Sequence, residues 1–318
     1  MKNHFTIEEA IGRAAISLAT HPFDYVKILI QIGYEPLPAV PVTTIWGKKR
    51  MQYPGVFSYL GHIRRNDGII GCYRGIGYKL TYSLLHGFVY VNSTEFVKST
   101  ISSLSATRML TESNEEEEEK EEKDNRGLLN PEKLKELLDQ LMRETACKFL
   151  AIAIAYPFQV MAVRSCSQFI GRESVYDTLL GSVSDIYSNS GLRGFYVGFM
   201  PKFVGDCVVL WTTHGLIYVI KGLLPAENKS LQSYVNASIN FIITSACYPF
   251  QLVSTVMICN GLPAASLESS ALSGRDPYAD WIDCWRHLSA NGQLKRGSSM
   301  FWRYQPITAK SYVTTHGY

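Results

Sequence analysis

The chain has few charged residues and no uninterrupted hydrophobic run of membrane length. Charged residues make up 19% of the 318-residue sequence, and hydrophobic residues make up 46%, whereas typical soluble domains are about 25% charged. Polar or charged residues break each of the long apolar stretches, so a window of about 19 residues scores them as marginal spans. Such interruptions are typical of membrane helices with one face toward a polar interior. A basic soluble protein is the alternative that composition leaves open.

The sequence also lacks the patterns of several kinds of site. Its seven cysteines are scattered without a CxxC pair, so neither a disulfide framework nor a zinc site is predicted. The glycines near residues 75–87 and 191–198 are not followed by Lys-Ser or Lys-Thr, which argues against a nucleotide-phosphate loop. His86 and His214 are expected to be satisfied by contacts within the protein. We expect no enzyme activity, no cofactor, no metal and no nucleic-acid partner.

Acidic residues are concentrated in one segment. Residues 112–126 hold nine acidic and three basic residues, a net charge of −6 in a chain whose total is +3. The rest of the chain therefore carries +9, which suits contact with an anionic lipid surface. We expect the acidic run to be a solvated loop, with docking of a basic partner as the alternative. The first residues show no Arg-rich amphipathic pattern, so no cleavable targeting segment is predicted.

A short string recurs three times along the chain. It reads His-Pro-Phe-Asp at residues 21–24, and Tyr-Pro-Phe-Gln at residues 156–159 and 248–251. Each copy lies in an apolar stretch and is followed by a polar residue and glycine, at 67–68, 190–191 and 291–292. Internal repeats indicate one structural unit that packs against its own copies. We predict an all-α membrane protein in which three helix pairs surround an axis.

The predicted boundaries follow from this repeat. Long apolar segments cover residues 5–32, 76–97, 141–169, 202–224 and 231–262, and short amphipathic helices cover 56–66, 176–188 and 279–291. The three repeats then occupy residues 1–105, 131–228 and 229–318, separated after the first by an acidic disordered loop at 106–130.

The third repeat departs from the pattern. A sixth span of about 20 residues should follow Gly292, but residues 295–318 are polar. We therefore expect the sixth transmembrane helix to be missing. Pro22, Pro157 and Pro249 are expected to kink their helices, so that the bundle narrows at one end.

Several strings resemble the signature of the mitochondrial carrier family, which reads Pro-x-acid-x-x-base, a short helix, acid-Gly and aromatic-base-Gly. The first repeat matches it from residues 22–27 through 67–68 to 73–75, and the later repeats keep the prolines and several of the glycines. More narrowly, the strings at 33–38, 168–174 and 281–285 are similar to those of the mitochondrial carrier homologue group. The resemblance covers nearly the whole chain, except the acidic loop.

This resemblance implies a multi-pass protein of the mitochondrial outer membrane that inserts α-helical and tail-anchored proteins. It also implies lipid scrambling and docking of a pro-apoptotic BH3 protein. Membrane lipids and helical client proteins are then the expected partners.

The residues at the gate positions favour an insertase over a carrier. In a carrier, each of three helices supplies an acid two residues after the proline and a base five residues after it. Only the first repeat supplies both, as Asp24 and Lys27, because the later repeats hold Gln and Ala or Gln and Ser there. A ring of three ion pairs cannot form, and alternating access needs two differently stabilised closed states. A solute carrier and a docking scaffold remain the alternatives.

Five side chains are predicted to line a polar groove that opens to the bilayer: Asp24, Lys27, Arg164, Asp206 and Tyr248. A lone charge at mid-bilayer costs about 2.5–3.5 kcal/mol on insertion scales, and a hydrated groove offers it partners during passage. Each residue also has a structural interpretation. Asp24 and Lys27 could pair on one helix, and Asp206 could be an interfacial acid that the dipole near a helix start favours. Arg164 could reach headgroups, and Tyr248 could pack in an aromatic belt.

Overall fold

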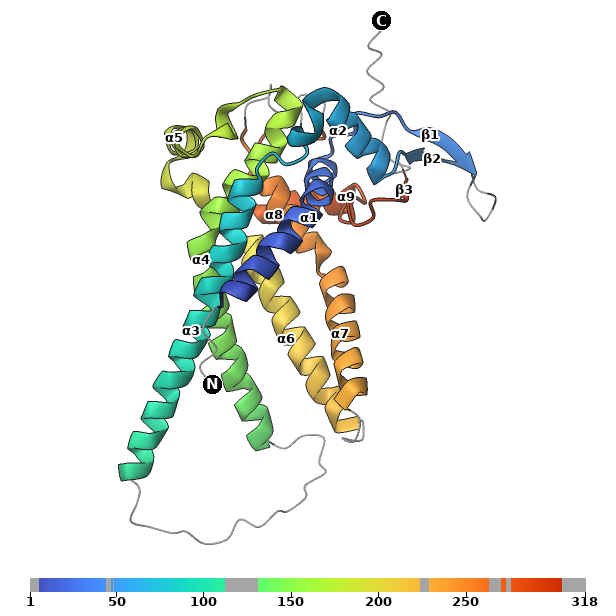
Figure 1. The fold of residues 1–318 in the computed structure, drawn as a ribbon. Helices are drawn as coiled ribbons and strands as arrows, with labels where there is room; N and C mark the ends of the chain where they lie inside the picture. Colours follow the sequence, from blue (N-terminus) through green and yellow to red (C-terminus); the bar gives the residue numbers. More distant parts are fainter. Residues whose placement is uncertain are drawn as a thin grey trace, which may run out of the picture. The chain divides into compact units, whose positions relative to one another are not determined.

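The computed structural model describes residues 6–43, 47, 49–111, 131–223, 229–262, 270–272 and 276–304. This part of the chain is mostly helical, with one small sheet (Figure 1). Its helices are α1 (Ile7–Ile32), α2 (Val56–Gly71), α3 (Ile76–Thr111), α4 (Pro131–Gly171), α5 (Leu179–Ser190), α6 (Phe199–Leu223), α7 (Lys229–Ala246), α8 (Tyr248–Ile258) and α9 (Trp281–Ala290). The all-α prediction is confirmed, and the predicted acidic loop falls largely outside the described residues.

The chain divides into two compact units. Unit 1 comprises Met1–Arg13, Ser83–Ala155 and Phe203–Cys247, and unit 2 comprises Ala14–Tyr82, Tyr156–Lys202 and Tyr248–Tyr318. Unit 1 therefore holds much of the long helices α3, α4 and α6 together with α7. Unit 2 holds the three proline strings, the three short helices α2, α5 and α9, and the sheet.

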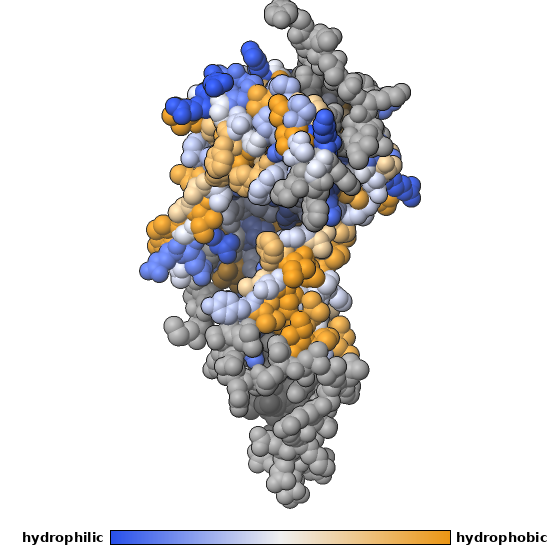
Figure 2. Space-filling model, turned by 90° about the vertical axis from the view of Figure 1, so that its right-hand side faces the viewer, coloured by the Kyte–Doolittle hydropathy of each residue, from blue (hydrophilic) through white to orange (hydrophobic). Residues whose placement is uncertain are grey.

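Two helical segments of the described chain are long and apolar enough to cross a membrane, Leu134–Gly171 and Leu179–Ile220. A third span exists if Gln232–Ala246 and Tyr248–Ile258 act together across a 46° bend. Helices α1 and α3 have the length, at 26 and 36 residues, but polar and charged residues interrupt them, as the sequence predicted. Apolar side chains gather over α7 (Figure 2), where Phe241 is 73% exposed and is thus available to lipid.

The three prolines lie in two different settings. Pro22 and Pro157 lie inside α1 and α4, which continue through them without interruption. The segment predicted at 231–262 instead breaks at Cys247 into α7 and α8, and Pro249 is the second residue of α8. Proline is well tolerated in the first turn of a helix because the amide there has no helical partner.

The short helices have clear local causes. The hydroxyl of Thr178 accepts a hydrogen bond from the amide of Gly181 at the start of α5. The carboxylate of Asp280 does the same for the amide of Asp283 at the start of α9, at 2.7 Å. These N-caps satisfy amides that the first helical turn leaves unpaired. Two apolar residues on one face of α9, Cys284 and Leu288, then pack with the buried residues of α8.

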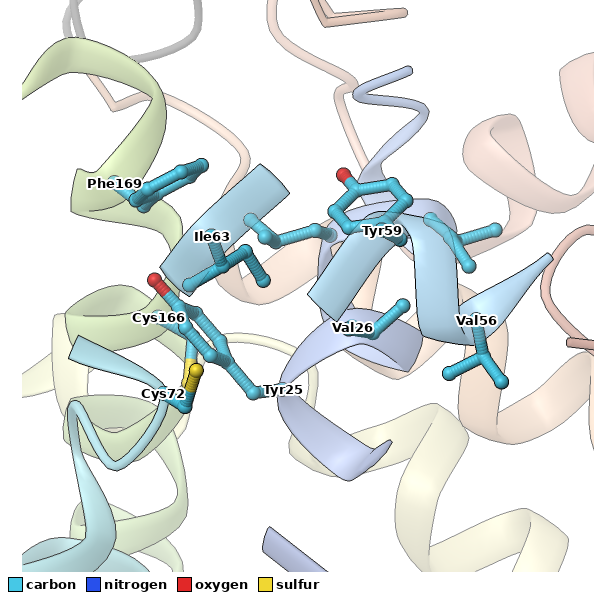
Figure 3. Packing of buried hydrophobic residues seen from close by; sticks show 10 residues of the cluster. Tyr25, Val26, Val56, Tyr59, Ile63, Cys72, Cys166 and Phe169 are labelled. Atoms are coloured by element: carbon cyan, nitrogen blue, oxygen red, sulfur yellow. The ribbon is translucent and has the colours of Figure 1, made fainter. Parts of the chain in front are cut away.

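The core of unit 2 forms where α1, α2 and α4 meet. Tyr25, Ile63 and Cys166 are each at most 1% exposed, and Figure 3 shows their side chains beside Phe169. The ring of Phe169 meets that of Tyr25 edge to face, with centroids 6.2 Å apart. Close packing of this kind is stabilising in proportion to the apolar area that it buries, and it fixes the short helix α2 against the ends of α1 and α4.

A small antiparallel sheet was not predicted. Strands β1 (Val40–Thr43) and β2 (Lys49–Tyr53) form a hairpin between α1 and α2, and β3 (Arg303–Tyr304) pairs with the other edge of β2. The register places Gln52 opposite Tyr304 and Tyr53 opposite Arg303. The third repeat is thereby joined to the first. Within residues 291–304, no helix follows α9, in agreement with the missing sixth span.

Candidate functional site

The residue before each repeated proline makes the same contact in unit 2. Nε2–H of His21 donates to the carbonyl of Arg74 at 2.9 Å. The hydroxyl of Tyr156 donates to the carbonyl of Val197 at 3.0 Å, and that of Tyr248 donates to the carbonyl of Arg296 at 2.6 Å. We call these three bonds the pre-proline contacts. Each ties a proline-bearing helix to the segment that follows the short helix of its own repeat.

Each of the three carbonyls precedes a glycine with a left-handed backbone. The φ angles of Gly75, Gly198 and Gly297 are 78°, 79° and 81°. A side chain at Gly198 would place its Cβ 2.6 Å from the carbonyl oxygen of Ser254, a distance that real structures do not allow. Glycine is required there both for its φ angle and for this close approach.

The three glycines also close a ring of contacts between repeats. Gly75 packs against Ser165 on α4, Gly198 against Ser254 on α8, and Gly297 against Gln31 on α1. Hydrogen bonds complete two of these joints. The hydroxyl of Ser254 donates to the carbonyl of Gly198 at 2.8 Å, and the amide of Gln31 donates to the hydroxyl of Tyr248 at 3.0 Å. The threefold order predicted from the sequence is thus visible in unit 2.

The third repeat has neutral contacts at the position where a carrier would have a gate ion pair. Ser254 occupies the base position of the third repeat, and its hydroxyl bonds to the carbonyl of Gly198 and to the hydroxyl of Tyr156, 3.2 Å away. In the first repeat, Asp24 forms an ion pair with Lys79 of α3 rather than with Lys27. The ammonium of Lys27 lies 5.3 Å from the ring centre of Tyr248, a cation–π contact.

Arg164 is buried, with 4% of its surface exposed. Its Nε–H donates to the carbonyl of Ile258 at 3.2 Å and its Nη1 donates to the hydroxyl of Tyr176 at 3.1 Å. Burial raises the pKa of Tyr176 to about 12, so its hydroxyl keeps its proton and donates to Asp185. This placement differs from the predicted groove lining, because the guanidinium of Arg164 is buried and donates to protein groups. Tyr248 is likewise 8% exposed and serves a pre-proline contact.

An open cavity lies between the first and second repeats of unit 2. Its volume is about 940 Å³, and its lining includes Arg74, Tyr78, Ser165 and Asp177. Arg74 is already paired with Asp67 at 3.2 Å. The described residues contain no cluster of three or more metal-binding side chains.

Unit 1 holds a pair of ionisable side chains within membrane-length helices. Nδ1 of His214 on α6 lies 3.8 Å from a carboxylate oxygen of Glu144 on α4, and both side chains are less than one-third exposed. Beside them, Nε1–H of Trp211 donates to the hydroxyl of Thr145 at 3.0 Å. We call these four residues the α4–α6 polar cluster. Ionisable residues inside membrane spans are expensive, so they mark candidate functional sites.

Sequence reasoning missed most of this cluster. Asp206, the residue that it selected on α6, is half-buried in unit 1, while the other four candidates belong to unit 2. The sequence predicts for His214 only contacts within the protein, and it assigns no role to Glu144. The signal that could have found them is the presence of an acid and a histidine inside segments that otherwise read as apolar. Their proximity depends on how α4 packs against α6, as the contact of Phe149 with Phe203 shows, at 5.2 Å between ring centres.

The chain matches one family along most of its length. Residues 10–105 and 135–228 match the model described as mitochondrial carrier protein. The chain is 32% identical over 310 residues to Mitochondrial carrier homolog 2 of Mus musculus, with 94% of each chain covered. It is 31% identical over 325 residues to Mitochondrial carrier homolog 1 of Mus musculus, with 92% of this chain and 75% of that one covered.

A more distant similarity reaches a solute transporter. The chain is 23% identical over 314 residues to the mitochondrial basic amino acids transporter of Mus musculus, with 95% of this chain and 84% of that one covered. The family is one of carriers and not of enzymes, and its members are multi-pass proteins of mitochondrial membranes. The chain belongs to the mitochondrial carrier protein family and, within it, to the mitochondrial carrier homolog group.

Proposed function

We propose that the protein inserts α-helical and tail-anchored proteins into the mitochondrial outer membrane through a polar groove that opens sideways to lipid. Scrambling of lipids is the accompanying activity, because a groove that admits polar peptide segments also admits headgroups. The observation that carries the proposal is the α4–α6 polar cluster, with Glu144 and His214 on two helices of membrane length.

The ring of contacts between the repeats of unit 2 argues against alternating access. A carrier must break and remake its gate, and an ion-pair ring can exchange its partners with water during that step. Here Ser254 and Tyr156 hold the junctions through buried hydroxyl and backbone bonds. Breaking such a bond without replacement leaves a buried polar group that costs about 1–3 kcal/mol. A ring of these contacts favours one fixed arrangement, which suits a groove that does not need to alternate.

The missing sixth span supplies the sideways opening. Residues 291–304 contain no helix, so the third repeat contributes α7 and α8 without a sixth partner among the described residues. A polar segment that crosses hydrocarbon alone meets a barrier of about 2.5–3.5 kcal/mol for each charge. The carboxylate of Glu144 and the imidazole of His214 offer hydrogen-bonding partners along such a path, and the barrier falls accordingly.

Reconstitution tests this function. The full chain, purified into liposomes without other proteins, should integrate a tail-anchored client into a protease-protected form, and empty liposomes should not. E144Q and H214F should lower the insertion rate several-fold, because each removes one member of the cluster. Y187F changes an exposed tyrosine of α5 in unit 2 and is the matched control. Equal insertion by all variants would reject the role of the cluster.

Two other functions give different results in the same liposomes. The similarity to the mitochondrial basic amino acids transporter supports solute exchange, which would appear as saturable counter-transport of a loaded solute. A receptor that only docks partners, such as a BH3 protein, would bind client without integrating it. Insertion without counter-transport is the outcome that we expect.

A further inference from the structure

The chain turns aside at the point where a sixth helix would begin. After the left-handed glycines of the first two repeats, α3 begins directly at Ile76 and α6 begins at Phe199. Within residues 298–304, the described part of the chain after Gly297, no helix begins; these residues run instead to the first repeat, where they end in β3. We call residues 298–304 the strap.

The strap is held in place by several contacts. The amide of Val56 donates to the carbonyl of Met300 at 3.0 Å. The guanidinium of Arg303 pairs with Glu35 and donates to the carbonyl of Pro54 at 2.7 Å. Arg303 is only 8% exposed. Its position is therefore fixed by the fold, and the side chains on either side of it are presented in a defined direction.

The side chains that this fixed backbone presents are large aromatic rings. Trp302 is 70% exposed, Phe301 is 46% exposed, and Phe57 at the start of α2 is 67% exposed. The ring centres of Phe57 and Phe301 lie 6.0 Å apart, and those of Phe301 and Trp302 lie 6.2 Å apart. A contiguous exposed aromatic patch marks an interaction surface. Trp in particular is enriched at the boundary between membrane and water.

The hairpin beside the strap carries positive charge. Residues 40–53 include three basic and no acidic residues. In the strap, the guanidinium of Arg303 pairs with Glu35. Lys49 and Arg50 are exposed on β2, with Arg50 5.7 Å from the ring centre of Tyr304. Figure 1 shows the hairpin projecting from α2 with β3 beside it. Cations beside aromatic rings complement anionic headgroups above an acyl boundary.

We propose that the strap and the hairpin form an interfacial anchor for an anionic lipid surface. Phe57, Phe301 and Trp302 insert into the boundary between headgroups and acyl chains, while Lys49 and Arg50 contact lipid phosphates. The anchor takes the place of a sixth span at the end of the third repeat, by lying in the interface rather than crossing it. It does not depend on the insertase function, because it concerns only how this part of the chain meets lipid.

Tryptophan quenching tests the anchor directly. The full chain is reconstituted into vesicles of phosphatidylcholine and phosphatidylserine, brominated either near the headgroup or near the chain end. In the wild type, shallow bromines should quench one component of the emission, and W302F should lose that component. W211F is the matched control, because Trp211 lies in a membrane-length helix and its loss should remove emission quenched by deep bromines.

Three outcomes would overturn the proposal. W302F could keep the full shallow quenching, or aqueous iodide could quench Trp302 while brominated lipid does not. Shielding of Trp302 only after a helical client is added would make the patch a protein-docking surface. The charge contribution has its own test. Shallow quenching should increase with the phosphatidylserine fraction in the wild type, and K49S/R50S should lose that dependence. An unchanged dependence in K49S/R50S would show that Lys49 and Arg50 do not contribute to lipid binding.

Discussion

The hydroxyl of Tyr248 donates a 2.6 Å hydrogen bond to the backbone carbonyl of Arg296, and so ties α8 to the segment that follows α9. The same hydroxyl accepts a bond from the amide of Gln31 on α1. The side chain of Tyr248 therefore connects two segments of the third repeat and also connects this repeat to the first.

Removal of this hydroxyl should destabilise the protein. Y248F leaves a buried carbonyl and a buried amide without their partner, and each such loss costs about 1–3 kcal/mol. We expect a lower thermal unfolding midpoint in detergent, measured by the release of protected thiols. Y187F, at a tyrosine that is 61% exposed, should unfold like the wild type. Coincident unfolding curves for the two variants would contradict the structural role of Tyr248.

Two glycines with positive φ angles should differ in their tolerance of alanine. The φ angles of Gly191 and Gly198 are 60° and 79°. Alanine at either position is disfavoured because residues with a side chain rarely adopt a positive φ angle. Only at Gly198 would the new Cβ also meet the carbonyl of Ser254. G198A should therefore lower the unfolding midpoint more than G191A does, and the reverse order would speak against the packing between repeats.

The partner of Asp24 can be identified by double-mutant cycles. Asp24 pairs with Lys79, and its side chain is 44% exposed, so we expect a coupling of about 0.2–1 kcal/mol for D24N with K79M, as for other exposed pairs. The cycle of D24N with K27M should give no coupling, because Lys27 contacts the ring of Tyr248. Coupling to Lys27 instead of Lys79 would indicate a pair within α1.

Glu35 should make stability fall with rising pH. Burial raises its pKa from 4.5 to about 7, although Arg303 opposes that shift. The folded state then holds a proton that the unfolded state releases above about pH 4.5. The contribution of Glu35 is complete below pH 4.5 and is lost as the pH rises through about 7. The unfolding midpoint of the wild type should drop more between pH 5 and pH 8 (values chosen on either side of that pKa) than that of E35Q. Parallel pH profiles would contradict this.

The positions of the helices could be predicted from the sequence, but the polar segments by which α3 and α4 extend beyond their apolar stretches could not. Apolar residues locate α1 and α6 closely, because burial requires them. Helix α3 runs to Thr111 and α4 begins at Pro131, beyond the apolar segments, because a helix that is already formed extends through polar residues at little cost. The hairpin of β1 and β2 was not predicted from the sequence, although Gly47 lies between these two short extended stretches.

The contacts of the site depended on tertiary packing that a sequence does not display. The string before each proline was visible, yet the carbonyl that His21 binds lies 53 residues away. Likewise, Lys79 is 55 residues from Asp24. Lys27 and Asp24 looked like partners because they are neighbours on one helix, whereas each finds a partner on another element. Arg164 looked like a groove residue because its charge interrupts an apolar run, whereas in the structure its guanidinium donates to the carbonyl of Ile258 and to the hydroxyl of Tyr176 inside unit 2.

Photocrosslinking from the α4–α6 polar cluster would test the proposed path of clients most directly. A photoreactive phenylalanine is placed at Trp211, next to Thr145 on α4, or at Tyr187 on α5 as the matched position in unit 2. While liposomes integrate a tail-anchored client, we expect adducts with its membrane segment from position 211 and few from position 187. Efficient insertion with adducts from position 187 alone would show that clients pass elsewhere.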